Sequence, residues 1–159
     1  MKIYVGADHA GFEMKNVLTQ FLQELGHEVI DLGAHVYDEE DDYPDFIIPV
    51  ARAVSEESED VRGLIIGGSG QGEAIAANKF RNVRAAVFNG QYAPSDGRAV
   101  PNEIALAREH NNTNVLSLGA RFLSIDEAKN AVCLWLETPF SGDERHVRRL
   151  QKIESAFKV

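Results

Sequence analysis

The chain has 159 residues, a formal net charge of −9 and one cysteine, with 44% hydrophobic and 26% charged residues. A chain of this length buries roughly 68–70% of its unfolded surface, so it needs no disulfide bonds. No apolar run approaches the ~20 residues of a membrane span, and the negative charge argues against nonspecific nucleic-acid binding. Because no signal-like segment precedes the first predicted strand, we expect a cytoplasmic protein.

The hydrophobic pattern predicts strands and helices that alternate along the chain. In chain order we expect a strand at 3–5, a helix at 12–25, a strand at 28–32, a helix at 46–55, a strand at 64–66, a helix at 72–79, a strand at 85–88, a helix at 103–109, a strand at 115–118, a helix at 124–136 and a C-terminal helix at about 143–157. Ser124 and Glu127 have the spacing of a capping box.

This alternation predicts a five-stranded parallel sheet with helices on both faces. The expected fold is a doubly wound α/β sandwich of three layers, Rossmann-like or flavodoxin-like, with an added C-terminal helix. We expect residues 1–159 to form one domain. A turn-rich loop at about 90–101 is longer than the usual connection of about 2–6 residues. It is either a functional lid or interface element, or a simple insertion.

The most informative stretch follows the third predicted strand and reads Gly67-Gly68-Ser69-Gly70-Gln71-Gly72-Glu73. Four glycines let the backbone turn tightly and direct several N–H groups to one point, beside a hydroxyl and a carboxylate. The spacing matches neither the dinucleotide fingerprint nor a Walker A loop. The loop is therefore either an anion site with a base or a close contact between helix and sheet.

Asp8 and His9 follow the first predicted strand. Because ligands in doubly wound folds bind beyond the carboxyl ends of the strands, we expect these two residues and the glycine loop to face one crevice. The acidic run at 38–42 reads as a solvated loop, since it lacks the spacing and the glycine of an EF-hand. The five histidines show no zinc-binding spacing, so we expect no metal. Cys133 reads as a buried, inert thiol.

Two basic residues, Arg145 and Arg149, share one face of the predicted C-terminal helix. They either clamp a phosphate or carboxylate, or form a solvated basic helix end. His110 precedes the last predicted strand, and an isolated histidine in such a loop is often only exposed or hydrogen-bonded. The residues alone leave both questions open.

Four groups of residues occur in a fixed order: GADHAG at 6–11, the glycine loop running on to AANK at 76–79, REHNN at 108–112, and Arg145-His146 with Arg149. Together they resemble the type B ribose-5-phosphate isomerases, a family that also includes galactose-6-phosphate isomerase subunits. The resemblance extends from Lys2 to about Ile153. Many members carry a cysteine at the position of Gly67, whereas a subgroup, which this sequence resembles, carries a carboxylate at that of Glu73.

The resemblance implies a metal-free, cofactor-free isomerisation of an aldose phosphate to a ketose phosphate through a cis-enediolate. One base moves the proton between C1 and C2. Ribose 5-phosphate is the default substrate and ribulose 5-phosphate its product. The alternatives are isomerisation of a hexose 6-phosphate, such as that of galactose or allose, and a noncatalytic sugar-phosphate sensor on the same fold.

The resemblance also implies roles for individual residues. Glu73 would be the base, Ser69 would orient the carbonyl end, and His110 would open the sugar ring, with Asp8 as an alternative or accomplice. The remaining residues implied in substrate and phosphate binding are His9, Gly68, Gly70, Gln71, Gly72, Asn111, Arg121, Arg145 and Arg149. Family members are homodimers or tetramers with shared sites, so we expect the C-terminal helix to reach a neighbouring subunit.

Overall fold

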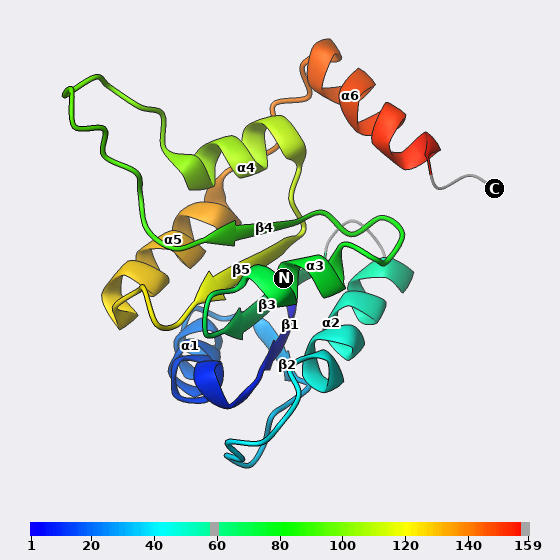
Figure 1. Ribbon diagram of the computed structural model, residues 1–159. Coiled ribbons are helices and arrows are strands. Elements are labelled where there is room, and N and C mark those ends of the chain that lie inside the picture. The colour runs from blue at the N-terminus through cyan, green and yellow to red at the C-terminus, as the bar shows by residue number, and fades with distance from the viewer. Residues whose placement is uncertain (58–60, 157–159) are drawn as a thin grey trace.

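The computed structural model describes residues 1–57 and 61–156. Its strands form one parallel sheet in the order β2-β1-β3-β5-β4, and the α/β prediction is confirmed (Figure 1). The strands are β1 at Lys2–Ala7, β2 at Glu28–Asp31, β3 at Val61–Gly67, β4 at Ala85–Phe88 and β5 at Val115–Gly119. The last strand lies between β3 and β4, so β4 forms an edge of the sheet.

The described residues also form six α-helices and one short 3-10 helix, of which the last two in the chain follow the last strand. They are the 3-10 helix His9–Gly11, α1 at Phe12–Glu24, α2 at Pro44–Glu56, α3 at Gln71–Ala77, α4 at Glu103–Asn111, α5 at Ile125–Glu137 and α6 at Glu144–Ser155. Helix α2 starts two residues earlier than expected, because the fixed φ of Pro44 suits the first helical turn. The capping box of Ser124 and Glu127 is present at the start of α5.

The helices cover both faces of the sheet. Helices α1, α4 and α5 pack with one set of strand residues, whereas α2 and α3 pack with the other. In β3, Leu64 and Ile66 face the first cluster and Ile65 faces the second. Successive side chains of a strand point to opposite faces, so the continuous apolar run 64–66 marks a strand buried on both sides.

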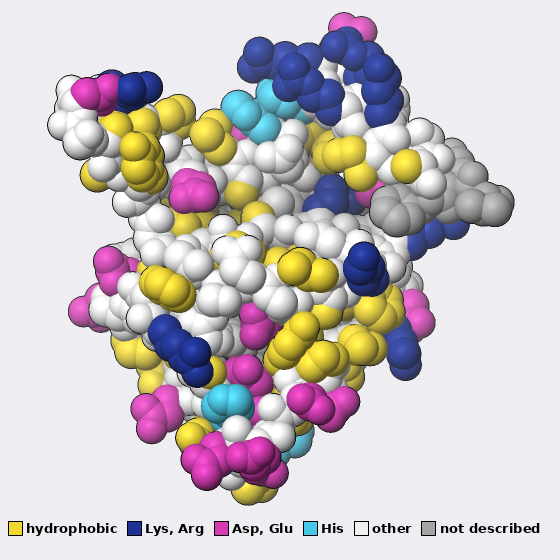
Figure 2. Space-filling model, in the orientation of Figure 1, with side chains coloured by type: hydrophobic (Ala, Val, Ile, Leu, Met, Phe, Trp, Pro, Cys, Tyr) yellow, Lys and Arg dark blue, Asp and Glu magenta, His cyan; other side chains and the backbone are white. Residues whose placement is uncertain are grey.

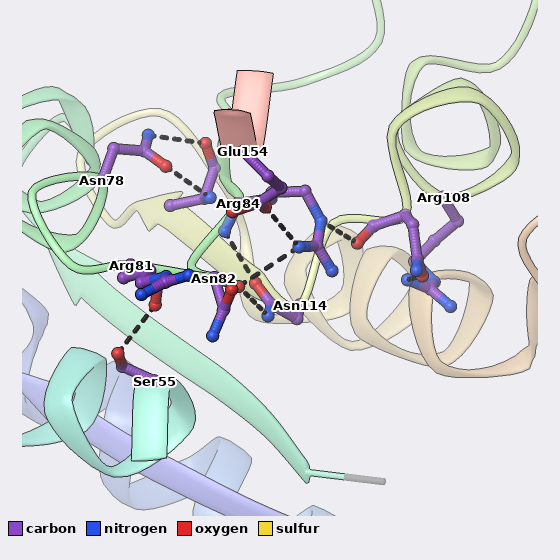
Figure 3. A network of polar contacts seen from close by, with 10 residues as sticks. Ser55, Asn78, Arg81, Asn82, Arg84, Arg108, Asn114 and Glu154 are labelled. Atoms are coloured by element: carbon purple, nitrogen blue, oxygen red, sulfur yellow. Dashed lines mark hydrogen bonds and ion pairs between the residues drawn. The ribbon is translucent and has the colours of Figure 1, made fainter. Parts of the chain in front are cut away.

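Helix α6 leaves the body of the protein after α5 (Figure 1). At its far end, Glu154 forms an ion pair with Arg84, with 3.1 Å between the charged atoms. The same arginine donates through Nε to the carbonyl oxygen of Asn112 over 2.9 Å, in the polar network of Figure 3. Ile153 of this helix is 53% exposed. Helix α6 is thus attached through the buried His146 near its start and the ion pair near its end, and it leaves Ile153 exposed.

The expected long loop between β4 and α4 contains no helix or strand and extends away from the sheet (Figure 1). Gln91 closes its base, since its side chain donates to the carbonyl oxygen of Pro101 and accepts from the backbone N–H of Glu103. Tyr92 near the start of the loop is 67% exposed. Among the described residues, no helix has the length and apolar character that crossing a membrane requires.

Candidate active site

A cleft of about 340 Å³ opens at the carboxyl ends of β1, β3 and β5. We call it the carboxyl-edge cleft, and its lining residues are Asp8, His9, Ala10, Tyr43, Gly68, Ser69, Gly72, Glu73, Arg121 and Phe122. As expected from the strand order along the chain, the residues after β1 and the glycine loop after β3 share one crevice. The topology explains this, because β1 and β3 are hydrogen-bonded neighbours.

The glycine loop is held in place by side chains from neighbouring strands. Ser117 of β5 donates its hydroxyl to the carbonyl oxygen of Gly70 over 2.7 Å. Asn89, directly after β4, donates through Nδ2 to the carbonyl oxygen of Ser69 over 3.0 Å. Gly70 has a φ of +74°, which only glycine adopts without strain. The loop is therefore fixed independently of any ligand.

Glu73 lies in the first turn of α3 and is only 4% exposed. Its carboxylate fills the space beside Gly67, where a Cβ atom would lie 1.8 Å from Oε1. Burial raises the pKa of Glu73, and the negative charge of Asp8 adds to this effect. A buried carboxylate with a raised pKa is the kind of group that serves as a general base near neutral pH.

Asp8 and His9, directly after β1, also line the cleft. Asp8 is 7% exposed and accepts a hydrogen bond from the backbone N–H of Gly11, which fixes its carboxylate. The ring of His9 binds Asp41, with 2.7 Å between Nδ1 and Oδ1. In the described part of the chain, Asp8, His9 and Asp41 are the one group whose side chains are placed to hold a metal ion, since their ligand atoms lie within 4.8 Å of one another.

Asp41 corrects one expectation from the sequence. The acidic run at 38–42 was expected to be solvated throughout, and residues 38–40 and 42 are exposed. The side chain of Asp41 is only 8% exposed, because it turns inward and binds His9. A run of charges carries no signal for which member is buried, so the sequence did not distinguish Asp41. Tyr43, whose ring lies against Gly72, was also missed, because no local pattern links it to the glycine loop.

Arg121 brings a positive charge into the cleft from the turn after β5. Its guanidinium lies over Gly68, where a Cβ atom would come within 3.1 Å of Cζ. A side chain at that position would press on the arginine. The cleft therefore combines a buried carboxylate, a cluster of backbone N–H groups and a guanidinium, which suits a polar ligand with an anionic end.

The other candidate residues lie elsewhere. Helix α4 runs back from the carboxyl edge to the start of β5, so His110 and Asn111 lie at the amino edge of the sheet. A strand of five residues spans about 17 Å, which separates them from Glu73. Figure 2 shows histidine and basic side chains gathered over α4 and α6, at the opposite end of the molecule from its main group of acidic side chains. Within one chain, the structure does not bring His110, Arg145 or Arg149 to the cleft.

The histidine from α4 forms a compact pair with one from α6. The rings of His110 and His146 stack with 4.2 Å between their centroids. His146 is buried, and its Nε2 accepts a hydrogen bond of 3.1 Å from Nε of Arg145. Burial lowers the pKa of His146, and the neighbouring His110 and Arg145 add to the effect. The sequence did not predict this pairing, because it depends on how α6 packs against α4.

A second cavity, of about 400 Å³, lies at the amino edge and is lined by Arg84, Asn114 and Glu154 among other residues. Its polar side chains bind one another or nearby backbone groups (Figure 3). Asn114, for example, donates to the carbonyl oxygen of Asn82 and accepts from the backbone N–H of Arg84. These contacts stabilise the edge of the sheet, and the carboxyl-edge cleft is the better candidate for chemistry.

Comparison with known proteins agrees with this geometry. Residues 3–153 match the family model described as Ribose/Galactose Isomerase. The chain is 43% identical over 152 residues to ribose-5-phosphate isomerase B of Mycobacterium tuberculosis, covering 94% of this chain and 86% of that protein. It is 40% identical over 152 residues to ribose-5-phosphate isomerase B of Escherichia coli K12, covering 96% and 93%.

Solved structures give the same result. The crystal structure of ribose-5-phosphate isomerase B from Mycoplasma genitalium with bound ribulose-5-phosphate has a TM-score of 0.89, with 36% identity and coverage of 99% of this chain and 96% of that one. The enzyme from Clostridium thermocellum has a TM-score of 0.86, with 42% identity and coverage of 99% and 98%. The chain therefore belongs to the ribose/galactose isomerase family.

Proposed function

We propose that this protein interconverts ribose 5-phosphate and ribulose 5-phosphate, with Glu73 as the base. The observation that carries the proposal is the buried carboxylate of Glu73 beside the glycine loop, in a chain of the ribose/galactose isomerase family. The Mycoplasma genitalium relative with bound ribulose-5-phosphate supports the choice of substrate. No cofactor is required, because the reaction only relocates protons and electrons within the sugar.

In the proposed reaction, Glu73 removes the proton from C2 of the open-chain aldose. The C2–H electrons form the C1–C2 double bond, and the carbonyl electrons move to O1. Glu73 then returns the proton to C1, while the O2 hydroxyl proton passes to O1 and C2 becomes the carbonyl carbon. The N–H groups of the glycine loop stabilise the developing negative charge, and Ser69 orients the carbonyl end.

We further propose that the complete site needs two copies of the chain, in a homodimer or a tetramer. The separation of His110, Arg145 and Arg149 from the cleft supports this, as does the projection of α6 from the body. Arg145 and Arg149 are exposed on α6, where they are available to a neighbour. In this arrangement His110 of one copy opens the sugar ring in the cleft of the other, with Asp8 assisting, and Asn111 and the arginines bind substrate and phosphate.

Mixing two inactive variants tests the shared site. Glu73→Gln removes the base and His110→Gln removes the ring-opening group, so each homodimer should be inactive. If the chains are unfolded and refolded together in equal amounts, half of the dimers are mixed and have one intact site. We expect about a quarter of the wild-type activity to return. Return of no activity, with mixed dimers shown to form, would contradict the shared site.

Turnover of purified protein in excess chelator tests the function itself. We expect fast conversion of ribose 5-phosphate, almost complete loss in Glu73→Gln, and no loss in Cys133→Ala. Cys133 is a matched control because it lies in α5, away from the cleft, and burial raises the pKa of its thiol. Activity on a hexose 6-phosphate alone would instead support the hexose alternative, and no activity on any sugar phosphate would support a sensor.

We also propose that residues 1–159 act as one isomerase domain and that the protein works in the cytoplasm. Phosphorylated sugars carry charge and do not cross the apolar interior of a membrane, so their enzymes work where the sugars are made. Cell fractionation with activity measurements would test the location.

A further inference from the structure

Asp41 makes a contact that the reaction described above does not use. It lies in the connection between β2 and α2 and contacts His9, which follows β1. Its Oδ1 lies 2.7 Å from Nδ1 of the imidazole and accepts a second hydrogen bond, of 3.1 Å, from the backbone N–H of His9. Two bonds to one residue fix both the backbone and the ring. The contact therefore fixes the orientation of the His9 side chain.

The second carboxylate oxygen of Asp41 is buried. Oδ2 has no hydrogen-bond partner among the residues that the structure describes, and the side chain as a whole is 8% exposed. An ionised carboxylate so enclosed is unfavourable unless a positive charge lies against it. The imidazole of His9 is the group in contact, so the pair is most favourable as carboxylate and imidazolium.

Of the other charged groups around His9, Asp8 favours the same charge state and Arg121 opposes it. Asp41 raises the pKa of His9 through its hydrogen bond, and the negative charge of Asp8 raises it further. Burial and the nearby positive charge of Arg121 act in the opposite direction, and the net effect is a raised pKa. Tyr37 contacts the ring edge-on at 6.5 Å between centroids and brings no charge.

The ring has a second nitrogen that no described residue binds. With Nδ1 turned to Asp41, the free donor of the imidazolium is Nε2, and His9 lines the carboxyl-edge cleft together with Arg121. Two cationic donors in one cleft match an anion such as a phosphate. A neutral His9 would offer one charge fewer, and its Nε2 would be a proton acceptor if Nδ1 kept its hydrogen.

We propose that Asp41 is a positioning residue that holds His9 in the charged form, with Nε2–H directed to the anionic end of the sugar phosphate. The inference rests on the proposed function, since it names how that site binds its substrate. Asp41 does not touch the reacting carbons. Its removal should therefore weaken binding and leave the chemical step at saturating substrate nearly unchanged.

A titration by NMR tests the pair without any substrate. The imidazole of His9 is followed against pH in wild type, Asp41→Asn and Asp42→Asn, all in chelator. Asp42 is the matched control because it is the next residue, has the same charge and is exposed. We expect a raised pKa of His9 in wild type and Asp42→Asn, and a clear fall in Asp41→Asn. A wild-type value at or below that of an ordinary histidine overturns the proposal, even if Asp41→Asn does not fold.

Kinetics then test the consequence for substrate. Near about pH 8, where an unassisted histidine is neutral, Asp41→Asn should raise KM for ribose 5-phosphate about tenfold or more, the loss expected for one charge-assisted contact. The kcat should stay within about twofold, and KM should return toward the wild-type value near about pH 6 as His9 becomes protonated. A purely structural role would give no such recovery. A fall in kcat at unchanged KM would overturn the proposal.

Two further outcomes are separated by the same measurements. If wild type converts no sugar phosphate but the NMR shift depends on Asp41, the proposed function fails while the ion pair stands, and the assignment to sugar phosphate is overturned. If a titration repeated without chelator perturbs His9 only when Zn²⁺ is added, and Asp41→Asn abolishes that response, the three side chains form a cation site and the positioning role is wrong.

Discussion

Replacing Gly67 with alanine should displace the proposed base while leaving the fold intact. The Cβ atom of an alanine would lie 1.8 Å from Oε1 of Glu73 and 2.2 Å from Cδ, whereas real Cβ contacts are essentially never under 3.0 Å. The carboxylate therefore has to move by more than about 1 Å, and a displacement of about 1 Å at a reacting group costs about 10²-fold in rate. This corresponds to about 2.7 kcal/mol of transition-state stabilisation.

The fold should tolerate the substitution. Gly67 ends β3 in an extended strand without a positive φ, and the atoms that a methyl group meets belong to the far end of a flexible side chain. We expect kcat for ribose 5-phosphate to fall about 10²-fold, with a melting temperature within a few degrees of wild type.

Gly68→Ala is the matched comparison, one residue further along. Its Cβ atom would lie 3.1 Å from the guanidinium of Arg121 and away from Glu73, so the expected change is a higher KM with kcat largely kept. If Gly67→Ala keeps kcat within about twofold of wild type, the position of Glu73 does not limit the reaction and the argument from geometry is refuted.

Three further predictions follow from the same site. In the double variant Gly67→Cys/Glu73→Ala, a thiol at position 67 would take the place of the carboxylate of Glu73. We therefore expect more activity than in Glu73→Ala, and loss of that activity when the thiol is alkylated. No gain in activity would show that a base at position 67 cannot replace one at position 73. Because burial raises the pKa of Glu73 above its ordinary value of 4.5, the fold loses stability as the pH rises from 4.5 through that raised pKa. At pH 7, Glu73→Gln should therefore have a higher melting temperature than wild type, by about 2–4 °C for each kcal/mol of stability gained. This difference should disappear below pH 4.5, the ordinary pKa of a glutamate. A lower melting temperature at pH 7 would argue against a buried charge at Glu73. Arg145→Ala or Arg149→Ala should raise KM through loss of a charge-assisted contact, and unchanged KM in both would remove them from phosphate binding.

Much of the fold was predictable because the spacing of apolar residues within each segment indicates its secondary structure. The apolar run 64–66 showed a strand buried on both faces, and helical spacing located α1 and α5 to within one or two residues. The alternation of these elements predicted the parallel sheet. The order of the last two strands was not predicted, since hydrophobic periodicity does not say whether β5 pairs with β3 or with β4 alone.

The candidate site divides in the same way. The sequence by itself indicated the glycine loop and the pair Asp8-His9, because both follow a predicted strand directly, and it indicated Glu73 at the end of that loop. Only the tertiary structure decided that Asp41 turns inward to His9, that the carboxylate of Glu73 occupies the space left by Gly67, and that His110 stacks on His146 at the far edge of the sheet. Local patterns report the spacing of apolar residues, whereas these contacts join segments far apart in the chain. Their distances are set by the order of the strands and the direction of the connecting helices.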